Sequence, residues 1–266
     1  MRLNSQEVEA TLVICSERPR VIESQISDLP MIGNYRLLPR DTKEIHDLYF
    51  DTIDHALKTQ NLALRIRKIG ATRWITMKGH SQPTGFEGLV DRSEIEVRWS
   101  QSSLRRVIQE LEDRRIGISH RGRDFDYAHP LEVLQSYGLK IIQDRKSHRK
   151  IRNIVKMEER DLILAELAID FVIYRFNSQE IRHHEVEIEV KEKSGFKGIK
   201  TIIEHLISMY HPSLRRWGHS KLATGKAVEE MMYVGELEGL LDTDKHLKPA
   251  AYDKIDEYLK YRINSF

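Results

Sequence analysis

The chain has 266 residues, of which 40% are hydrophobic and 32% are charged, so its composition is globular and far from that of disordered proteins. Its 43 lysines and arginines nearly balance its 41 aspartates and glutamates, which removes any overall argument for a nucleic-acid or membrane-binding surface. Cys15 is the only cysteine, which excludes an intrachain disulfide and fits a reducing compartment.

The amino-terminal residues lack an apolar signal segment, and no apolar run approaches the length of a membrane span. We therefore expect a soluble, cytoplasmic protein that has neither a membrane nor a nucleic acid as a partner. The sequence leaves the oligomeric state open.

The first half of the chain is dominated by strand patterns. Residues 7–14, 44–52, 62–79 and 92–99 alternate apolar and polar side chains, and 62–79 reads as a hairpin that turns near Gly70. Each of these strands therefore has one apolar and one charged or polar face. Their charged positions include Glu7, Glu9, Arg65, Arg67, Lys78, Glu94 and Glu96.

The second half continues the same alternation. Residues 140–157 predict a basic strand in which Arg145 and Arg149 fall in one register and Arg152 falls in the other. Strands at 162–176 and 181–192 follow, and their charged positions are Asp170, Glu185, Glu187 and Glu189. The connections at 80–91 and 114–128 have no clear periodicity.

Helical periodicity appears at intervals between these strands. The predicted amphipathic helices are 19–29, 102–113, 129–138, 198–210 and 221–233, with a further short helix near the end of the chain. We expect one domain over residues 1–234 and a separate helical extension over residues 235–266. The order of elements favours a mainly antiparallel sheet.

A charged face on one antiparallel strand is most often the solvated face. Here several strands share the pattern, with acids sorted onto some strands and bases onto others. An open sheet gives no reason for that sorting. A closed sheet with its charged faces inward explains the sorting, provided that the acids hold a divalent cation and the bases hold a polyanion.

A series of motifs carries a family resemblance over about residues 5 to 225. The segments EVE, YFDT, LALRIR, MKG, SEIEV, a basic strand, AID, EVEIEV and a late SK occur in that order. This set resembles the CYTH family, also called triphosphate tunnel metalloenzymes. The resemblance implies an α+β fold, an antiparallel eight-stranded closed β-barrel that forms a tunnel with flanking helices. It also implies Mg²⁺ or Mn²⁺ as cofactor and a triphosphate-containing small molecule as substrate.

The resemblance assigns roles to individual residues. The implied metal ligands are Glu7, Glu9, Asp170, Glu187 and Glu189. The implied substrate-binding bases are Arg65, Arg67, Lys78, Arg149 and Lys221, with Arg145 and Arg152 added according to the register of the basic strand. For catalysis we expect Lys78 to act as a point charge on the phosphate. The carboxylate that prepares the attacking water is sought among Glu94, Glu96, Glu187 and Glu189, with Glu94 and Glu96 named as the catalytic residues.

The expected activity is metal-dependent hydrolysis of a triphosphate, with inorganic tripolyphosphate first and thiamine or nucleoside triphosphates next. One alternative is an adenylate cyclase of the class IV type, which belongs to the same family. The other alternative is a non-catalytic triphosphate- or polyphosphate-binding module. The residue that suggests this alternative is Thr11, which stands where the family signature Glu-x-Glu-x-Lys has a lysine.

Overall fold

The computed structural model describes residues 2–79, 82–83, 90–118, 126–158, 162–177, 179–192 and 196–263. The chain divides into two compact units. The first unit contains Met1–Glu7, Ile45–Gln82 and Asp91–Arg145, and the second contains Val8–Glu44, Pro83–Val90 and Lys146–Phe266. The connections expected at 80–91 and 114–128 lie partly outside the described residues.

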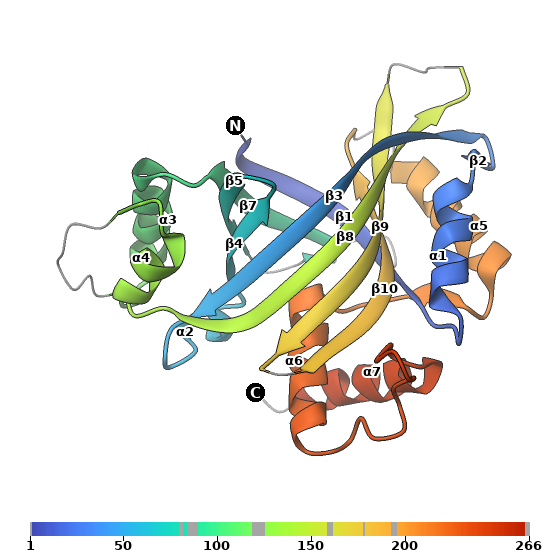
Figure 1. Ribbon diagram of the computed structural model, residues 1–266. Helices are drawn as coiled ribbons and strands as arrows, with labels where there is room; N and C mark the ends of the chain where they lie inside the picture. The colour runs from blue at the N-terminus through green and yellow to red at the C-terminus, as the bar shows by residue number, and fades with distance from the viewer. Residues whose placement is uncertain are drawn as a thin grey trace. The chain divides into compact units, whose positions relative to one another are not determined.

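Helices occur between groups of strands and at the end of the chain, as Figure 1 shows. The strands are β1 (Arg2–Ile14), β2 (Met31–Ile32), β3 (Tyr35–Asp51), β4 (Ala63–Ile69), β5 (Thr72–Lys78), β6 (Gln82–Pro83), β7 (Val90–Arg98), β8 (Lys140–Lys156), β9 (Ile163–Phe176), β10 (Gln179–Val190) and β11 (Leu214–Arg216). The helices are α1 (Pro19–Asp28), α2 (Ala56–Thr59), α3 (Gln101–Asp113), α4 (Pro130–Ser136), α5 (Phe196–Tyr210), α6 (Lys221–Tyr233) and α7 (Pro249–Ile263).

The strands pair into a ring of eight. The pairing order is β1-β10-β9-β8-β3-β4-β5-β7, and β7 pairs back to β1. The registers of β1–β10, β9–β10, β3–β4, β4–β5 and β5–β7 are all antiparallel. The α+β fold with eight antiparallel strands that the sequence predicts is therefore confirmed.

The core of the first unit lies on one face of its strands. Alternate residues of β4, β5 and β7, among them Leu64 and Ile75, pack against the apolar side of α3, which includes Leu104, Val107 and Leu111. Helix α3 begins where Ser100 Oγ accepts a hydrogen bond from the Ser103 amide at 3.1 Å. The other face of these strands is left for polar side chains.

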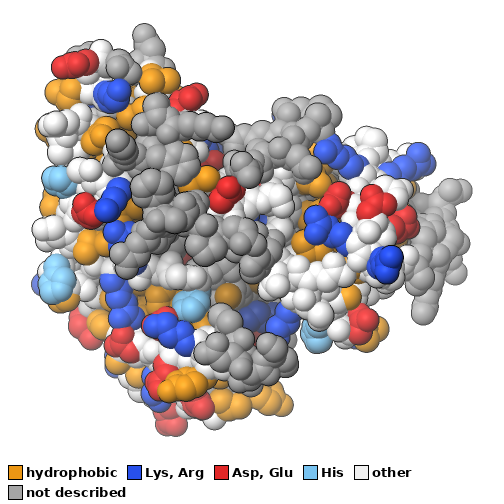
Figure 2. All heavy atoms as spheres, turned by 180° about the vertical axis from the view of Figure 1, so that it is seen from behind, with side chains coloured by type: hydrophobic (Ala, Val, Ile, Leu, Met, Phe, Trp, Pro, Cys, Tyr) orange, Lys and Arg blue, Asp and Glu red, His pale blue; other side chains and the backbone are white. Residues whose placement is uncertain are grey.

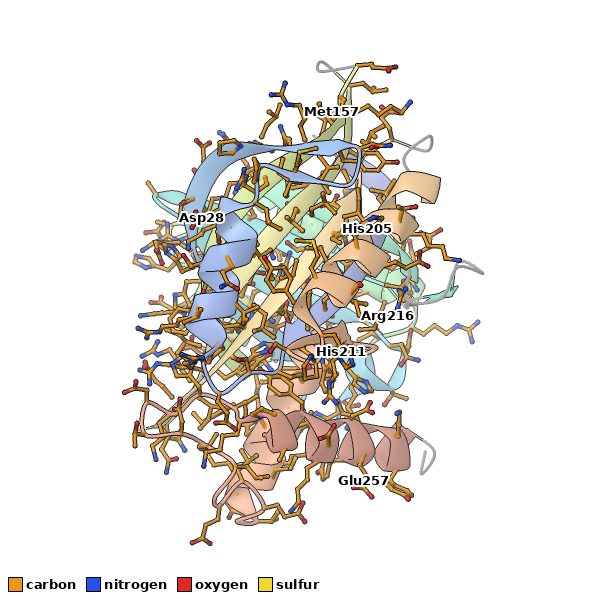
Figure 3. All side chains as sticks on the ribbon, turned by 90° about the vertical axis from the view of Figure 1, so that its right-hand side faces the viewer. Asp28, Met157, His205, His211, Arg216 and Glu257 are labelled. Atoms are coloured by element: carbon orange, nitrogen blue, oxygen red, sulfur yellow. The ribbon has the colours of Figure 1, made fainter. Side chains whose placement is uncertain are left out.

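The second unit has two apolar cores. In one, α1 and α5 cover alternate residues of β1, β9 and β10, as Figure 3 shows with Asp28 at the end of α1 and His205 on α5. In the other, α6 and α7 pack with Trp217 and Tyr174, and Figure 1 shows the two helices next to each other. Residues 235–263, expected as a separate extension, supply Leu247, Tyr252 and Ile255 to this core.

Most predicted elements lie where the sequence places them, including the hairpin that turns through Gly70 at a φ of +57°. The strands β1 and β3 begin earlier than expected, at Arg2 and Tyr35.

On the face shown in Figure 2, acidic and basic side chains are interspersed. Among the described residues, no helix combines the length and the apolar character needed to cross a membrane.

Candidate active site

In the first unit, neighbouring strands present charged side chains on one face. The antiparallel registers place Asp47 opposite Arg67, Tyr49 opposite Arg65, and Lys78 opposite Glu94. Residues opposite each other in an antiparallel pair share a face, so these side chains meet. We call the group the basic cluster: Glu7, Asp47, Tyr49, Arg65, Arg67, Lys78, Arg92, Glu94, Glu96 and Arg145.

Asp47 holds three guanidinium groups of the basic cluster. It accepts hydrogen bonds from Arg67 at 2.7 and 2.8 Å and from Arg145 at 2.7 Å, while Arg65 Nη1 lies 3.7 Å away. The Tyr49 hydroxyl accepts from Arg65 at 3.2 Å and from Arg145 at 2.8 Å. Burial alone raises the pKa of Asp47, but the arginines outweigh it and hold that pKa well below its ordinary value. Asp47 thus stays ionised and fixes the arginines.

Lys78 lies between two carboxylates of the same cluster. Its Nζ is 2.6 Å from Glu7 Oε2 and 3.3 Å from Glu94 Oε1, and Arg92 Nε is 3.1 Å from Glu7 Oε2. Burial works to raise the pKa of Glu7, but Lys78 and Arg92 outweigh it and lower that pKa. Glu7 is therefore an anion at neutral pH, with two cations beside it.

Glu96 is a third anion of the basic cluster, held by neighbouring donors. Its Oε2 accepts hydrogen bonds from Arg65 at 3.3 Å and from Thr76 at 3.1 Å. Burial opposes its ionisation, but the adjacent cations, Arg65 first among them, lower its pKa below the ordinary value. At 34% exposure its side chain is the most accessible of the three carboxylates that face Arg65.

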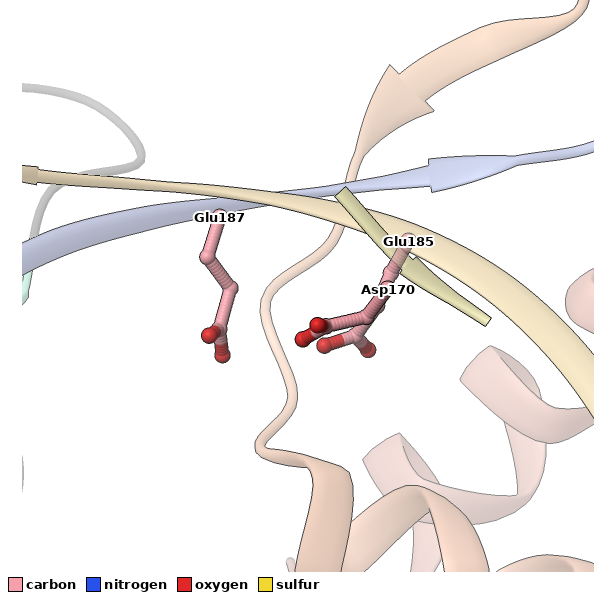
Figure 4. Close-up of side chains that lie close together, drawn as sticks. All are labelled: Asp170, Glu185 and Glu187. Carbon is pink, nitrogen blue, oxygen red and sulfur yellow. The ribbon is translucent and has the colours of Figure 1, made fainter. Parts of the chain in front are cut away.

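In the second unit, three carboxylates converge on one face of β9 and β10. Asp170 lies directly opposite Glu185 in the strand register, and Glu187 follows two residues later. Each offers an oxygen, and these oxygens all lie within 4.8 Å of one another. Figure 4 shows the three side chains on the same side of the strands. We call Asp170, Glu185 and Glu187 the acidic cluster.

Two basic side chains neutralise the acidic cluster. Arg149 donates to Asp170 at 2.7 and 2.6 Å and to Glu187 at 2.6 Å. Lys221 Nζ lies 3.1 Å from Asp170 and 2.5 Å from Glu187, and it also contacts Glu185. Burial raises the pKa of Asp170, but Arg149 and Lys221 outweigh it and lower that pKa. The cluster is thus a buried anionic centre that already attracts cations.

The sequence profile of the CYTH domain matches residues 20–214, more than half of the chain. The chain belongs to the CYTH domain family. The match extends through β10 and α5, and so includes the three carboxylates of the acidic cluster.

A solved structure shares the fold of this CYTH domain. HpAC1 from Hippeastrum, a candidate adenylyl cyclase with a dominant triphosphatase activity, is 18% identical over 84% of this chain and 96% of that chain, with a TM-score of 0.52. A candidate adenylate cyclase from Bacillus halodurans is 18% identical over 82% of this chain and 96% of that one, with a TM-score of 0.47. Comparison with curated protein sequences gives no match.

The donor chemistry of the acidic cluster fits a hard divalent cation. Its ligand atoms are carboxylate oxygens, which Mg²⁺ and Mn²⁺ prefer over nitrogen or sulfur. Lys221 shows that a positive charge is accommodated among all three carboxylates. The acidic cluster is therefore the group in the described part of this CYTH domain that could hold the family's metal.

The predicted metal ligands fall into three places. Asp170 and Glu187 lie in the acidic cluster, whereas Glu7 lies in the basic cluster with Lys78. Glu9 and Glu189 face each other across β1 and β10, and Glu189 Oε1 pairs with Lys191 at 2.5 Å.

The predicted phosphate-binding bases also divide between the clusters. Arg65, Arg67, Lys78 and Arg145 lie in the basic cluster, and Arg149 and Lys221 lie beside the acidic cluster. The two expected catalytic carboxylates, Glu94 and Glu96, both belong to the basic cluster.

Arg152 lies apart from both groups of bases. Its guanidinium donates to the backbone carbonyl of Leu37 at 2.6 Å and to that of Ser27. The alternation of β8 explains this, because Arg152 is an odd number of residues from Arg149 and Arg145 and so faces the opposite side of the sheet. The structure does not bring this predicted substrate-binding residue to either cluster.

Four cluster residues were missing from the predicted site: Asp47, Tyr49, Arg92 and Glu185. Glu185 had a visible signal, because it lies two residues before Glu187 on the same face of β10. The role of Asp47 depends on arginines of other strands, one of them 98 positions away in the sequence. Tyr49 is uncharged, so the pattern of charges does not select it. Arg92 stands two residues before Glu94 on the same strand, so alternation places it on the same face, and this signal was not used.

Thr11, where the family signature has a lysine, lies opposite Glu187 in the β1–β10 register. Glu187 is the carboxylate that both Arg149 and Lys221 contact, at 2.6 and 2.5 Å. Positive charge next to this position of the sheet is therefore supplied by β8 and α6 instead of β1.

Proposed function

We propose that this CYTH domain hydrolyses a triphosphate with the help of Mg²⁺ or Mn²⁺, and that inorganic tripolyphosphate is its first candidate substrate. The observation that carries the proposal is the acidic cluster, with ligand oxygens within 4.8 Å of one another beside Arg149 and Lys221 in a member of this family. The dominant triphosphatase activity of HpAC1, a relative in fold, supports it.

Each cluster by itself has bases that can bind phosphate. Arginine is suited to this role, because its planar guanidinium can donate two parallel hydrogen bonds to phosphoryl oxygens. Asp47 and Tyr49 hold Arg65 and Arg145 in place, so less side-chain entropy is lost when an anion binds. Lys78 adds a point charge that Glu7 and Glu94 keep in position.

The acidic cluster is the candidate metal holder, through oxygens of Asp170, Glu185 and Glu187. A bound divalent cation supplies charge neutralisation of the phosphates and polarisation of a phosphoryl oxygen. Lys221 and Arg149 are the side chains that have to rearrange around it, since they now contact these carboxylates.

The reaction adds water to a terminal phosphorus atom and breaks the bridging P–O bond, so tripolyphosphate gives orthophosphate and diphosphate. The barrier falls mainly through neutralisation of charge on the phosphoryl oxygens, here by fixed guanidinium groups. Glu96 is the carboxylate to which we assign the orientation of the attacking water. Its lowered pKa keeps it ionised and able to accept a hydrogen bond from that water.

The test is release of orthophosphate by the purified protein from tripolyphosphate, thiamine triphosphate and nucleoside triphosphates, each with Mg²⁺ and with Mn²⁺. We expect release from at least one of them, with tripolyphosphate fastest, and loss of release on chelation. Absence of release from all of them under both metals would overturn the proposal.

A second candidate function is an adenylate cyclase, because HpAC1 is a candidate adenylyl cyclase. Analysis of the products from ATP separates the two activities. Cyclic AMP with diphosphate would indicate the cyclase, and ADP with orthophosphate would indicate the triphosphatase. Tight binding that persists for hours without product would indicate a binding module instead.

A further inference from the structure

The basic strand β8 has a second basic face that neither cluster uses. Arg145 and Arg149 point to one side of the sheet, and His148 and Lys150, at odd spacing from them, point to the other. On that other side, His148 and Lys150 line a cavity of about 360 Å³ in the second unit, together with Arg20 and Glu23 of α1 and Phe171 of β9.

The carboxylate that lines this cavity, Glu23, is already neutralised, and the lining residue His148 is paired with the exposed Glu44. Glu23 Oε2 forms a hydrogen bond of 2.8 Å with His184 Nδ1, and Glu23 Oε1 lies 3.2 Å from Lys150 Nζ. Glu23 is only 7% exposed and His184 only 1%, so this buried pair holds the Glu23 carboxylate in a fixed position at the cavity. The lysine has three donors, and Glu23 is the one carboxylate of the described residues that pairs with it, so donors remain for a ligand.

Arg20 is the second cation of the cavity. Its guanidinium lies over the Phe171 ring, 5.6 Å from the ring centroid, and Phe171 is also stacked with His184 at a centroid distance of 5.0 Å. The aromatic contact orients the guanidinium without using its N–H donors. In the described part of the chain, no carboxylate forms an ion pair with Arg20, whereas Lys150 has Glu23.

We propose that this cavity is a second binding site, separate from both clusters, for a small anion that carries a phosphate group held by Arg20 and Lys150. Both side chains are cations that donate several N–H groups, which suits the many acceptors of a phosphate. The volume is large enough for pyrophosphate or for a nucleoside monophosphate. The phosphate can therefore come from a free inorganic anion or from a phosphate monoester, and the site does not depend on the proposed hydrolysis.

The test is NMR titration of the full chain with inorganic phosphate, pyrophosphate and AMP, in a chelating buffer that suppresses metal-dependent turnover. The ring signals of His148, which lines the cavity, report binding there. We expect saturable shifts of these signals in the wild type, and affinities at least 10-fold weaker in Arg20→Ala and in Lys150→Gln. Arg20 is on the surface, so Arg20→Ala should fold normally, and the matched control Lys200→Ala on the exposed side of α5 should bind as the wild type does.

Tighter binding of AMP than of both inorganic anions would identify a monoester as the ligand, and the reverse order would identify a free anion. The proposal is overturned if the His148 signals do not saturate with any of the three. It is also overturned if Arg20→Ala and Lys150→Gln bind like the wild type, or if Arg65→Ala in the basic cluster removes the shifts. None of these readouts involves hydrolysis, so failure of the triphosphatase activity would leave this result interpretable.

Discussion

Lys221 and Asp170 form an ion pair with 3.1 Å between Nζ and Oδ2, and the same ammonium group contacts the other two carboxylates of the acidic cluster. Lys221 therefore carries the positive charge at the place where we assign a divalent cation. Two cations at one small site repel each other, so Lys221 and the metal ion compete for these carboxylates.

Replacing Lys221 with methionine should raise the affinity of the metal-free protein for Mn²⁺ by about tenfold or more, because the competing charge is removed. The same change should lower the free energy of unfolding without metal, since three carboxylates lose a buried partner. Calorimetric titration with Mn²⁺ and urea unfolding measure the two effects. Lys226→Met, five residues further along α6, is the control that should change neither quantity. Unchanged Mn²⁺ affinity in Lys221→Met would contradict the competition.

Glu185→Gln tests a ligand that the family resemblance did not select. The substitution keeps the shape of the side chain and removes one charged oxygen from the acidic cluster, so Mn²⁺ affinity should fall by about 10- to 100-fold. Triphosphate turnover should fall at least as much. The exposed Glu192→Gln serves as the matched control. Wild-type affinity in Glu185→Gln would remove this residue from the metal site.

The strand alternation explains why so much of the site could be predicted. Glu94, Arg65 and Lys78 share a face because side chains of a strand alternate, and the pairing of Lys78 with Glu94 follows from the antiparallel register. Strand alternation alone could not decide which acidic residues of β10 lie beside Asp170. Glu185, Glu187 and Glu189 all lie on one face of β10, and only the position of Asp170 opposite Glu185 decides which of them meet it.

The register of the basic strand could not be decided from sequence, because β8 is basic on both faces. Arg145, Arg149 and Arg152 look alike along the chain, and only the pairing of β8 in the fold separates Arg152 from the others. Asp47 was missed for another reason: its role depends on Arg65, Arg67 and Arg145, and Arg145 is 98 positions away in the sequence.

Arg149→Ala should affect substrate binding, whereas Arg152→Ala should affect the stability of the fold. Arg149 contacts Asp170 and Glu187 and is assigned to phosphate binding, so its loss should raise the KM for tripolyphosphate about tenfold or more. Arg152 donates to backbone carbonyls, so its loss should lower the free energy of unfolding by about 2 kcal/mol and leave KM unchanged. Steady-state kinetics and urea unfolding of both variants measure this. A raised KM in Arg152→Ala alone would reverse the assignment of the strand faces.

Acid should destabilise the folded protein through its buried carboxylates. Burial opposes ionisation of Asp170 and Glu7, but their basic neighbours outweigh it, so both folded pKa values lie below the ordinary values of 3.8 and 4.5. Such groups stabilise the fold above their ordinary pKa, and this stability is lost as the pH falls toward the lower, folded pKa.

We therefore expect these carboxylates to leave the free energy of unfolding unchanged between pH 7 and about pH 5, and to lower it progressively below about pH 4.5. Urea unfolding at a series of pH values measures the slope. In Asp170→Asn the slope should be smaller, because one of the titrating groups is gone. Stability that is constant or rises from pH 5 to pH 3 would contradict the ion pairing described for both clusters.

The central claim is that this CYTH domain couples a metal held by carboxylates to the hydrolysis of a triphosphate. The most direct measurement is orthophosphate release from inorganic tripolyphosphate by the metal-free protein, by the protein with added Mg²⁺ or Mn²⁺, and by Glu185→Gln under the same conditions. The account predicts no release without metal, release with at least one of the metals, and strongly reduced release in the variant. Release that is independent of metal, or that is the same in Glu185→Gln as in the wild type, would contradict it.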